Sequence, residues 1–318
     1  MLRLPPFQVS SPTTLRAVLE ALAEGPNARL LAGGTDLLPN LKHRLAAPER
    51  LISLARVPEL VRIEDQGSAL SIGSGVTLRA LGEHERVRRV FPSLATAAGE
   101  VASPVIRNMG TLGGNIHLEP RCRYVNQSAF WRRGIGGGCL KSEGDRCHVV
   151  PKGRNCVAAM SSDCVPVLIA LEADFELASV RGSRVVAARD YFRADGLRAT
   201  VRADDEVLVA VRLPTPTARR LERYVKWTVR KSIDFPLISI ALRFDLEGPS
   251  DDASVLDAVV VVGVLGAKPR RVGRMDELVG RSAGDPQLAE EVADRVHAQC
   301  KPLENVPYEA DYRRKMLR

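Results

Sequence analysis

Four of the six cysteines fall within one stretch of the chain, at Cys122, Cys139, Cys147 and Cys156. Four thiolates are the ligand set of an iron–sulfur cluster or of a structural zinc ion. The intervals between them hold 16, 7 and 8 residues, which matches neither the paired spacing of zinc ribbons nor the spacing of ferredoxins. The spacing alone therefore leaves three interpretations open: a cluster, a zinc site and buried structural thiols.

The same stretch carries most of the excess positive charge. Residues 121–156 contain eight basic and two acidic residues, a net charge of +6, whereas the whole chain has a net charge of +8. A nucleic-acid-binding protein spreads its basic residues along a face with interleaved aromatic residues, and aromatic residues make up only 4% of this chain. The local charge instead suits a negatively charged cluster, or an acidic electron-transfer protein docked over it. We expect no nucleic-acid partner.

Two glycine turns form a second kind of candidate site. The first, Leu31-Ala32-Gly33-Gly34-Thr35-Asp36-Leu37, joins a predicted strand at 29–32 to a predicted helix at 37–45, and the second, Gly110-Thr111-Leu112-Gly113-Gly114-Asn115, directly precedes the cysteines. Backbone N–H groups in such turns bind anions such as a pyrophosphate. One such turn alone is more typical of an ordinary tight turn. Two together predict one extended ligand that is held at two places, without the dinucleotide fingerprint G-x-G-x-x-G.

Short strands and helices must position these groups. Hydrophobic periodicity predicts helices at 13–24, 78–87, 91–102, 274–279, 288–299 and 308–316. It predicts strands at 51–54, 61–64, 69–73, 165–171, 175–180, 184–187, 204–214, 224–228, 237–244 and 256–265. We interpret Cys164 and Cys300 as packing residues. No apolar run is long enough to cross a membrane, and with no export signal recognised we expect a cytoplasmic protein.

Three segments resemble a known family: Leu31–Leu38, Ile106–Ile116 and Lys226–Leu237. They resemble the FAD-binding (medium) subunit of the molybdenum hydroxylase family, which includes xanthine dehydrogenase and carbon monoxide dehydrogenase. The resemblance covers essentially the whole chain and implies an α+β fold. It implies a two-subdomain FAD-binding domain of the vanillyl-alcohol-oxidase or PCMH type at 1–217, with an iron–sulfur insert at about 118–160. A C-terminal sheet-and-helix domain of the CO dehydrogenase flavoprotein type would follow at 218–318.

The insert carries a narrower resemblance. Most members of the family run from the second glycine turn almost directly to a Ser-Asp pair, here Ser162-Asp163, whereas this chain inserts about forty residues that contain the four cysteines. The segments at 121–128 and 144–150 are similar to the loop of the beta subunit of 4-hydroxybenzoyl-CoA reductase, which carries a 4Fe–4S cluster.

Site residues follow from the resemblance position by position, and none of them is catalytic. It implies that the backbone of Leu31, Ala32, Gly33, Gly34, Thr35, Asp36 and Leu37 wraps the FAD pyrophosphate. Gly110, Thr111, Gly113, Gly114 and Asn115 would clamp it from the second turn. Asp163 would hydrogen-bond the ribose or adenine side, while Leu208 and Lys226 would lie near the isoalloxazine ring. The four grouped cysteines would bind the 4Fe–4S cluster.

The implied function is electron transfer within a larger oxidoreductase. The partners would be a molybdenum-cofactor catalytic subunit and a small 2Fe–2S subunit, in a hetero-oligomer such as a dimer of heterotrimers. Ferredoxin or another low-potential carrier would supply electrons for reductive dehydroxylation to benzoyl-CoA, a step of aromatic degradation. Two alternatives stay open. One is a family member that passes electrons outward from an aldehyde or aromatic substrate, and the other is a free-standing zinc-binding or flavin-storage protein.

Overall fold

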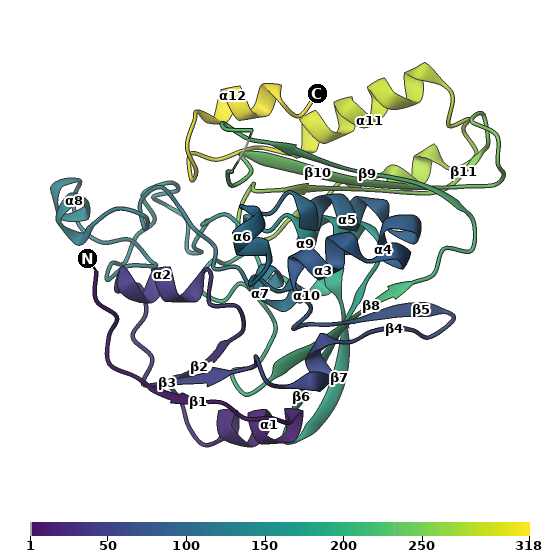
Figure 1. Ribbon diagram of the computed structural model, residues 1–318. Helices are drawn as coiled ribbons and strands as arrows, with labels where there is room; N and C mark the ends of the chain where they lie inside the picture. Colours follow the sequence, from purple (N-terminus) through teal and green to yellow (C-terminus); the bar gives the residue numbers. More distant parts are fainter. Residues whose placement is uncertain (1, 232) are drawn as a thin grey trace.

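The computed structural model describes residues 2–231 and 233–318, and it has a mixed α+β architecture built on three sheets (Figure 1). Ser232, which belongs to the 226–237 segment of the family resemblance, lies outside the described residues. The predicted α+β class is confirmed.

A small parallel sheet forms the N-terminal layer. Its strand order is β1-β3-β2, and its strands and helices are β1 (Gln8–Ser10), α1 (Leu15–Ala23), β2 (Ala28–Leu31), α2 (Leu37–Lys42) and β3 (Arg50–Ser53). The Thr14 hydroxyl caps α1 by accepting a hydrogen bond from the Ala17 N–H. The apolar face of α1 packs through Val18 and Leu22 on Ile52 of the sheet. This layer places the turn between β2 and α2 at the end of β2, which was expected to be buried but is only partly so, with Arg29 exposed.

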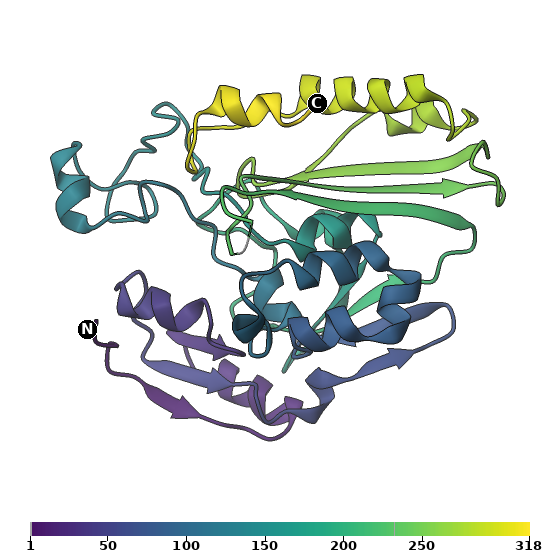
Figure 2. The same ribbon diagram turned by 45° about the horizontal axis from the view of Figure 1, so that its top comes forward.

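A five-stranded antiparallel sheet forms the second layer, with the order β4-β5-β8-β6-β7. Its strands are β4 (Ile63–Asp65), β5 (Ala69–Gly73), β6 (Asp174–Ser179), β7 (Gly182–Ala187) and β8 (Val207–Pro214), and the 3-10 helix η1 (Pro58–Val61) precedes β4. The helices connected to this layer are α3 (Leu78–Glu83), α4 (Glu85–Val90), α5 (Pro92–Gly99), α6 (Pro104–Arg107), α7 (Leu112–Ile116), α9 (Cys164–Ala170) and α10 (Ala188–Tyr191). Helices α3, α5 and α9 lie between this layer and the C-terminal sheet (Figures 1 and 2).

The C-terminal sheet is antiparallel, with the order β12-β11-β10-β9. Its strands and helices are β9 (Arg219–Trp227), β10 (Ile238–Leu246), β11 (Val255–Gly263), β12 (Arg270–Arg271), η2 (Met275–Leu278), α11 (Pro286–Gln299) and α12 (Ala310–Lys315). Along β11, Val259 and Val261 join the main core with α5 and α9, whereas Val260 and Val262 join a second core with α11. Because both faces are covered from Ala258 onward, this part of the strand is a continuous apolar run.

The cysteine-containing insert leaves the scaffold and returns to it at one point. Arg121 and Ala159 exchange two backbone hydrogen bonds of 3.0 and 2.8 Å, so the two ends of the insert lie side by side. Between them the chain is mostly irregular and includes α8 (Ala129–Gly134). Helix α8 projects away from the rest of the molecule in both views (Figures 1 and 2).

The prediction of a strand at 165–171 is wrong, because this segment is helix α9. Every residue of α9 is buried, and a short apolar run does not distinguish a buried strand from a helix that is covered on all sides. Pro166 lies in the first turn of the helix, where its missing N–H costs nothing.

Three further predictions need correction. The helix predicted at 78–87 is two helices, α3 and α4, because His84 between them has an extended backbone with ψ of 123°. The strand predicted at 61–64 begins only at Ile63, after the 3-10 turn of η1. The helix predicted at 274–279 is the short 3-10 helix η2. The remaining predicted elements are present with shifted ends.

Candidate cofactor sites

The first glycine turn presents a row of unused hydrogen-bond donors. The backbone N–H groups of Gly33, Gly34, Thr35 and Asp36 have no acceptor among the residues that the structure describes. Gly34 has a φ of +71°, a left-handed conformation that glycine adopts without strain. Consecutive free N–H groups of this kind form a concave anion site. The turn therefore fits the pyrophosphate of a dinucleotide, because its four free N–H groups can donate hydrogen bonds to the phosphate oxygens.

The second glycine turn lies directly against the first. A Cβ atom added to Gly33 would overlap the carbonyl oxygen of Met109, and one added to Gly110 would lie 3.5 Å from Thr35 Oγ1. More than seventy residues separate the two turns in the sequence. The structure thus brings together the two segments that the sequence pattern assigns to one ligand.

Gly113 and Gly114 differ in what surrounds them. A Cβ on Gly113 would lie 2.8 Å from Ser74, so this glycine permits close packing of the turn on the scaffold. A Cβ on Gly114 would meet only Thr111 Oγ1, at 3.2 Å, and Gly114 is exposed. Thr111 is the N-cap of α7, and its hydroxyl accepts a hydrogen bond from the Gly114 N–H. Gly114 is thus the glycine of this turn that leaves room for a ligand.

Asn115 fixes the start of α9 from the second turn. Its side-chain oxygen accepts hydrogen bonds from the Ser162 hydroxyl at 2.6 Å and from the Cys164 N–H at 3.2 Å. Both groups flank Asp163, so Asn115 determines where the Asp163 carboxylate lies. Asn115 is buried, and its side chain contributes to the site by positioning this segment.

Asp163 and Lys226 form a buried ion pair. Lys226 Nζ lies 3.1 Å from Asp163 Oδ1, with both side chains at most 6% exposed. The Tyr224 hydroxyl donates a 2.6 Å hydrogen bond to the same oxygen. Burial raises the pKa of Asp163 to about 6, although Lys226 and Tyr224 act in the opposite direction. The family resemblance implies that Asp163 and Lys226 contact different parts of an extended FAD, whereas the structure pairs them with one another. No sequence pattern predicts the contribution of Tyr224.

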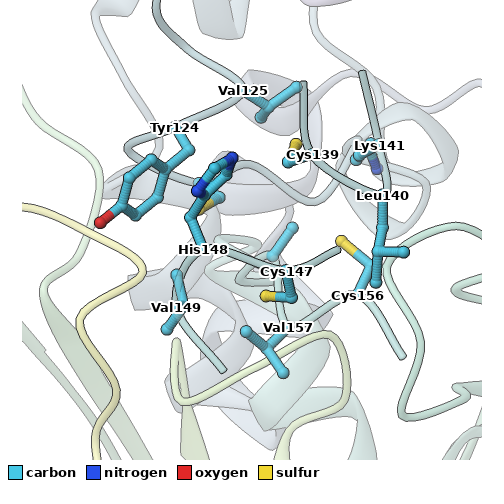
Figure 3. Close-up of a pocket in the computed structure, with 12 residues that line it drawn as sticks. Tyr124, Val125, Cys139, Leu140, Lys141, Cys147, His148, Val149, Cys156 and Val157 are labelled. Carbon is cyan, nitrogen blue, oxygen red and sulfur yellow. The ribbon is translucent and has the colours of Figure 1, made fainter. Parts of the chain in front are cut away.

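Cys122, Cys139, Cys147 and Cys156 line one cavity, which we call the thiol hollow (Figure 3). All four are buried and none forms a disulfide. The other residues that line the thiol hollow are Tyr124, Val125, Leu140, Lys141, His148, Val149, Val157 and Ala158. The fold thus gathers four thiols from a stretch in which they are widely spaced.

Local hydrogen bonds hold the loops around the thiol hollow. Cys139 and Ser142 form a tight turn through hydrogen bonds in both directions, of 3.2 and 2.7 Å. The Asp195 carboxylate, which lies on the scaffold, accepts a 3.1 Å hydrogen bond from the Cys156 N–H. Lys141 pairs with Glu119 and donates to the Gly196 carbonyl oxygen. The thiols are therefore anchored to the scaffold on one side of the insert.

The four thiols of the thiol hollow do not converge on a single point. Among the described residues, no three His, Cys, Asp or Glu side chains are gathered closely enough to hold a single ion, although all four cysteines line the same cavity. Burial, with smaller contributions from the Cys139 and Cys156 thiols, raises the pKa of Cys122 to about 11, and burial also raises the pKa of Cys156. Thiols must lose their protons when they bind a metal centre, so metal binding at these two residues would release protons. Four free, buried thiols fit a centre with four thiolate ligands.

The comparison with known families covers nearly the whole chain. The family described as the FAD binding domain in molybdopterin dehydrogenase matches residues 5–216, and the CO dehydrogenase flavoprotein C-terminal domain matches residues 223–318. The chain belongs to the FAD-binding subunits of the molybdenum hydroxylase family. This flavoprotein subunit is therefore part of an oxidoreductase, and both predicted domain types are confirmed.

Individual relatives agree with this assignment. The flavoprotein subunit is 29% identical to the carbon monoxide dehydrogenase medium chain of Hydrogenophaga pseudoflava, over 98% of this chain and 93% of the relative. It is 31% identical to the aldehyde oxidoreductase FAD-binding subunit PaoB of Escherichia coli K12, over 87% and 85%. A solved structure of the Hydrogenophaga pseudoflava dehydrogenase, which lacks the Mo-pyranopterin moiety, superposes with a TM-score of 0.79 at 27% identity, covering 99% of this chain and 94% of that chain.

Three other predicted positions lie apart from any open site. Leu208 is buried in the main core of the flavoprotein subunit and pairs with Leu177 across β8 and β6, so its place beside the isoalloxazine ring stays a prediction. Cys164 and Cys300 are buried in the main core and in the C-terminal core, as expected for packing residues. Within the described residues, none of the helices has the length and hydrophobicity needed to span a bilayer.

His117 makes the second glycine turn sensitive to pH. Its Nδ1 contacts the Gly113 carbonyl oxygen at 2.8 Å, its Nε2 contacts the Tyr191 hydroxyl at 2.6 Å, and burial lowers its pKa to about 4. The unfolded chain takes up a proton near pH 6.5 and the folded chain only near pH 4, so stability is lost as the pH falls through this window. We expect His117 to cost about 2 kcal/mol of unfolding free energy between about pH 7.5 and pH 5.

The measurement is urea unfolding of the purified flavoprotein subunit at both pH values, beside the His117→Gln variant. Glutamine retains hydrogen-bonding groups but does not titrate, so the variant should lose less stability on acidification. Equal losses in both proteins would assign the pH dependence to other groups.

Proposed function

We propose that this chain is the FAD and 4Fe–4S electron-transfer subunit of a molybdenum-containing 4-hydroxybenzoyl-CoA reductase. The observation that carries the proposal is the thiol hollow, in which four free, buried cysteines from the basic insert line one cavity. Support for the specific enzyme comes from the similarity of the segments at 121–128 and 144–150 to the insert of its beta subunit.

Two separate sets of residues would hold the two cofactors. Leu31–Leu37 and the 110–115 turn would hold FAD through free backbone N–H groups and through the space beside Gly114. The four cysteines would hold the cluster. FAD and the iron–sulfur centre supply the redox chemistry when bound. The chain's own residues would orient the two cofactors, and the net positive charge of the insert would stabilise negative charge at the thiol hollow.

The proposed assembly follows the family. The partners would be a molybdenum-cofactor subunit, which binds the substrate, and a small 2Fe–2S subunit, in the cytoplasm. Ferredoxin or another low-potential carrier would supply two electrons per turnover. With two protons these remove the phenolic hydroxyl as water and leave benzoyl-CoA. The proposed boundaries are 1–217 for the FAD-binding domain, with the insert at about 118–160, and 218–318 for the C-terminal domain.

A second candidate is the subunit of an aldehyde oxidoreductase that passes electrons outward to an acceptor. The observation that favours it is the 31% identity to the aldehyde oxidoreductase subunit PaoB. It uses the same FAD site and the same thiol hollow, so it differs only in the substrate of the partner subunit and in the direction of electron flow.

The purified complex distinguishes these candidates. We expect about one FAD, four iron and four acid-labile sulfide per chain, in keeping with a four-thiolate cluster, and turnover of 4-hydroxybenzoyl-CoA with a low-potential donor. Oxidation of aldehydes with an artificial acceptor, and no reductase activity, would establish the second candidate. Zinc in place of iron and sulfide would contradict both and would support a zinc-binding protein.

A further inference from the structure

The insert carries positive charge that nothing in the described structure neutralises. Arg133, Arg146, Lys152 and Arg154 are exposed, and none has a carboxylate within 4.0 Å among the described residues. Two other basic residues of the insert are paired with carboxylates, Arg123 with Glu304 at 3.4 Å and Lys141 with Glu119. Uncompensated charges that face solvent raise the local concentration of oppositely charged partners.

Two exposed aromatic side chains lie on α8, in the same insert as these charges and on the same helix as Arg133. Phe130 is 80% exposed, more than any other large apolar side chain in the described residues, and Trp131 is 39% exposed. Helix α8 projects from the body of the molecule in both views (Figures 1 and 2). Aromatic and arginine side chains are the residue types enriched at the centres of protein interfaces.

Ring contacts connect this surface to the thiol hollow. The Trp131 and Tyr124 rings lie 6.0 Å apart between centroids, and the Tyr124 ring stacks on His148 at 5.2 Å with an interplanar angle of 20°. Tyr124 and His148 both line the thiol hollow (Figure 3). A protein that covers α8 would therefore lie only a few side chains from the four cysteines.

We propose that this insert patch, formed by Phe130, Trp131, Arg133, Arg146, Lys152 and Arg154, docks a small acidic electron-carrier protein. The proposal rests on the proposed function, because it assigns the entry or exit of electrons to the thiol hollow. Each encounter moves one electron between the carrier's centre and the centre held by the four thiols, so that one is oxidised as the other is reduced. The same docking surface would serve whether electrons enter or leave the subunit there.

Its composition favours a transient acidic carrier over a permanent subunit. Permanent interfaces are large and apolar, whereas redox encounters bury little area and depend on complementary charge. Here four exposed, unpaired cations and two exposed aromatic side chains belong to one insert, with Arg133 on α8 itself and Arg146 hydrogen-bonded to the Gly136 carbonyl oxygen just after this helix. Binding should therefore be fast, weak and strongly dependent on salt.

The test uses the whole purified complex and a small acidic two-cluster ferredoxin as the probe. In the double variant Arg133→Glu with Lys152→Glu, we expect binding of the ferredoxin to weaken at least about tenfold at about 50 mM salt, and much less at about 500 mM. Phe130→Ala should weaken binding severalfold at both salt concentrations. Reduction by a small artificial dye, and the iron, sulfide and FAD contents, should not change.

Arg88→Glu on α4 is the matched control, because Arg88 is exposed and has no carboxylate partner among the described residues. Ferredoxin binding in the double variant equal to that in the control, with iron retained, would overturn the docking site and leave the cluster assignment standing. Loss of the partner subunits from the double variant would overturn it in favour of a subunit interface. A wild-type complex without iron would refute the proposed function itself.

Discussion

Replacing Gly114 by valine should leave the purified flavoprotein without bound FAD. A Cβ at this position meets only Thr111 Oγ1 within the protein, so the added side chain enters the space left for the ligand and not the core. We expect the FAD content to fall at least about tenfold, which corresponds to about 1.4 kcal/mol of lost binding free energy. The flavin absorbance and the FAD released on denaturation measure this directly.

Two further glycine variants test this interpretation, one as a control and one at the other turn. Gly248→Val adds the same side chain at a turn where no atom lies within 4 Å of a Cβ, and it should retain FAD. Gly34→Val should also lose FAD, but it combines a positive φ with contacts to Leu31 and Leu38, so its effect includes backbone strain. Stoichiometric FAD in both the Gly34 and the Gly114 variants would contradict the assigned role of the two turns.

Replacing Cys139 or Cys147 by serine should remove the iron–sulfur centre while FAD stays bound. Both thiols line the thiol hollow, and the two ends of the insert are closed at the scaffold by the Arg121–Ala159 hydrogen bonds. The loop can therefore change without disturbing the glycine turns. We expect iron and acid-labile sulfide to be lost, and electron exchange with a protein carrier to slow at least about a hundredfold, about 2.7 kcal/mol.

Artificial dyes that reach the flavin or the partner subunit directly should still support turnover. Cys300→Ser is the control, because Cys300 is equally buried but lies in the C-terminal core, away from the thiol hollow, and it should keep its iron. Serine variants that retain full iron would show that these thiols are structural. Equal loss of both electron routes would mean that the insert is required for folding.

The sequence predicted elements well where burial is one-sided, and less well where it is complete. Helix α1 and strand β6 follow the expected hydrophobic periodicity, because one face of each is more buried than the other. Helix α9 is buried on all sides and was predicted as a strand. When every face of a segment is buried, the sequence has no polar face whose period would distinguish a helix from a strand.

The candidate sites also differ in how far the sequence could predict them. The glycine turns and the grouped cysteines were visible because their residue types are rare and local, and the structure gathers each set in space. The Asp163–Lys226 pair, with the hydrogen bond from Tyr224, joins residues 63 positions apart on different elements. No local pattern encodes such a contact, since it depends on how the C-terminal sheet packs over α9.

The closure of the insert at Arg121 and Ala159 also bears on how such a subunit could have arisen. A segment whose two ends lie at hydrogen-bonding distance can be added to a scaffold, or removed from it, without displacing the chain on either side. In this sense the cysteine-containing insert is a separable unit, and the FAD-binding scaffold does not depend on it for its own structure. A loop that carries four cysteines can thus be gained in a single insertion event, while the surrounding fold keeps its shape.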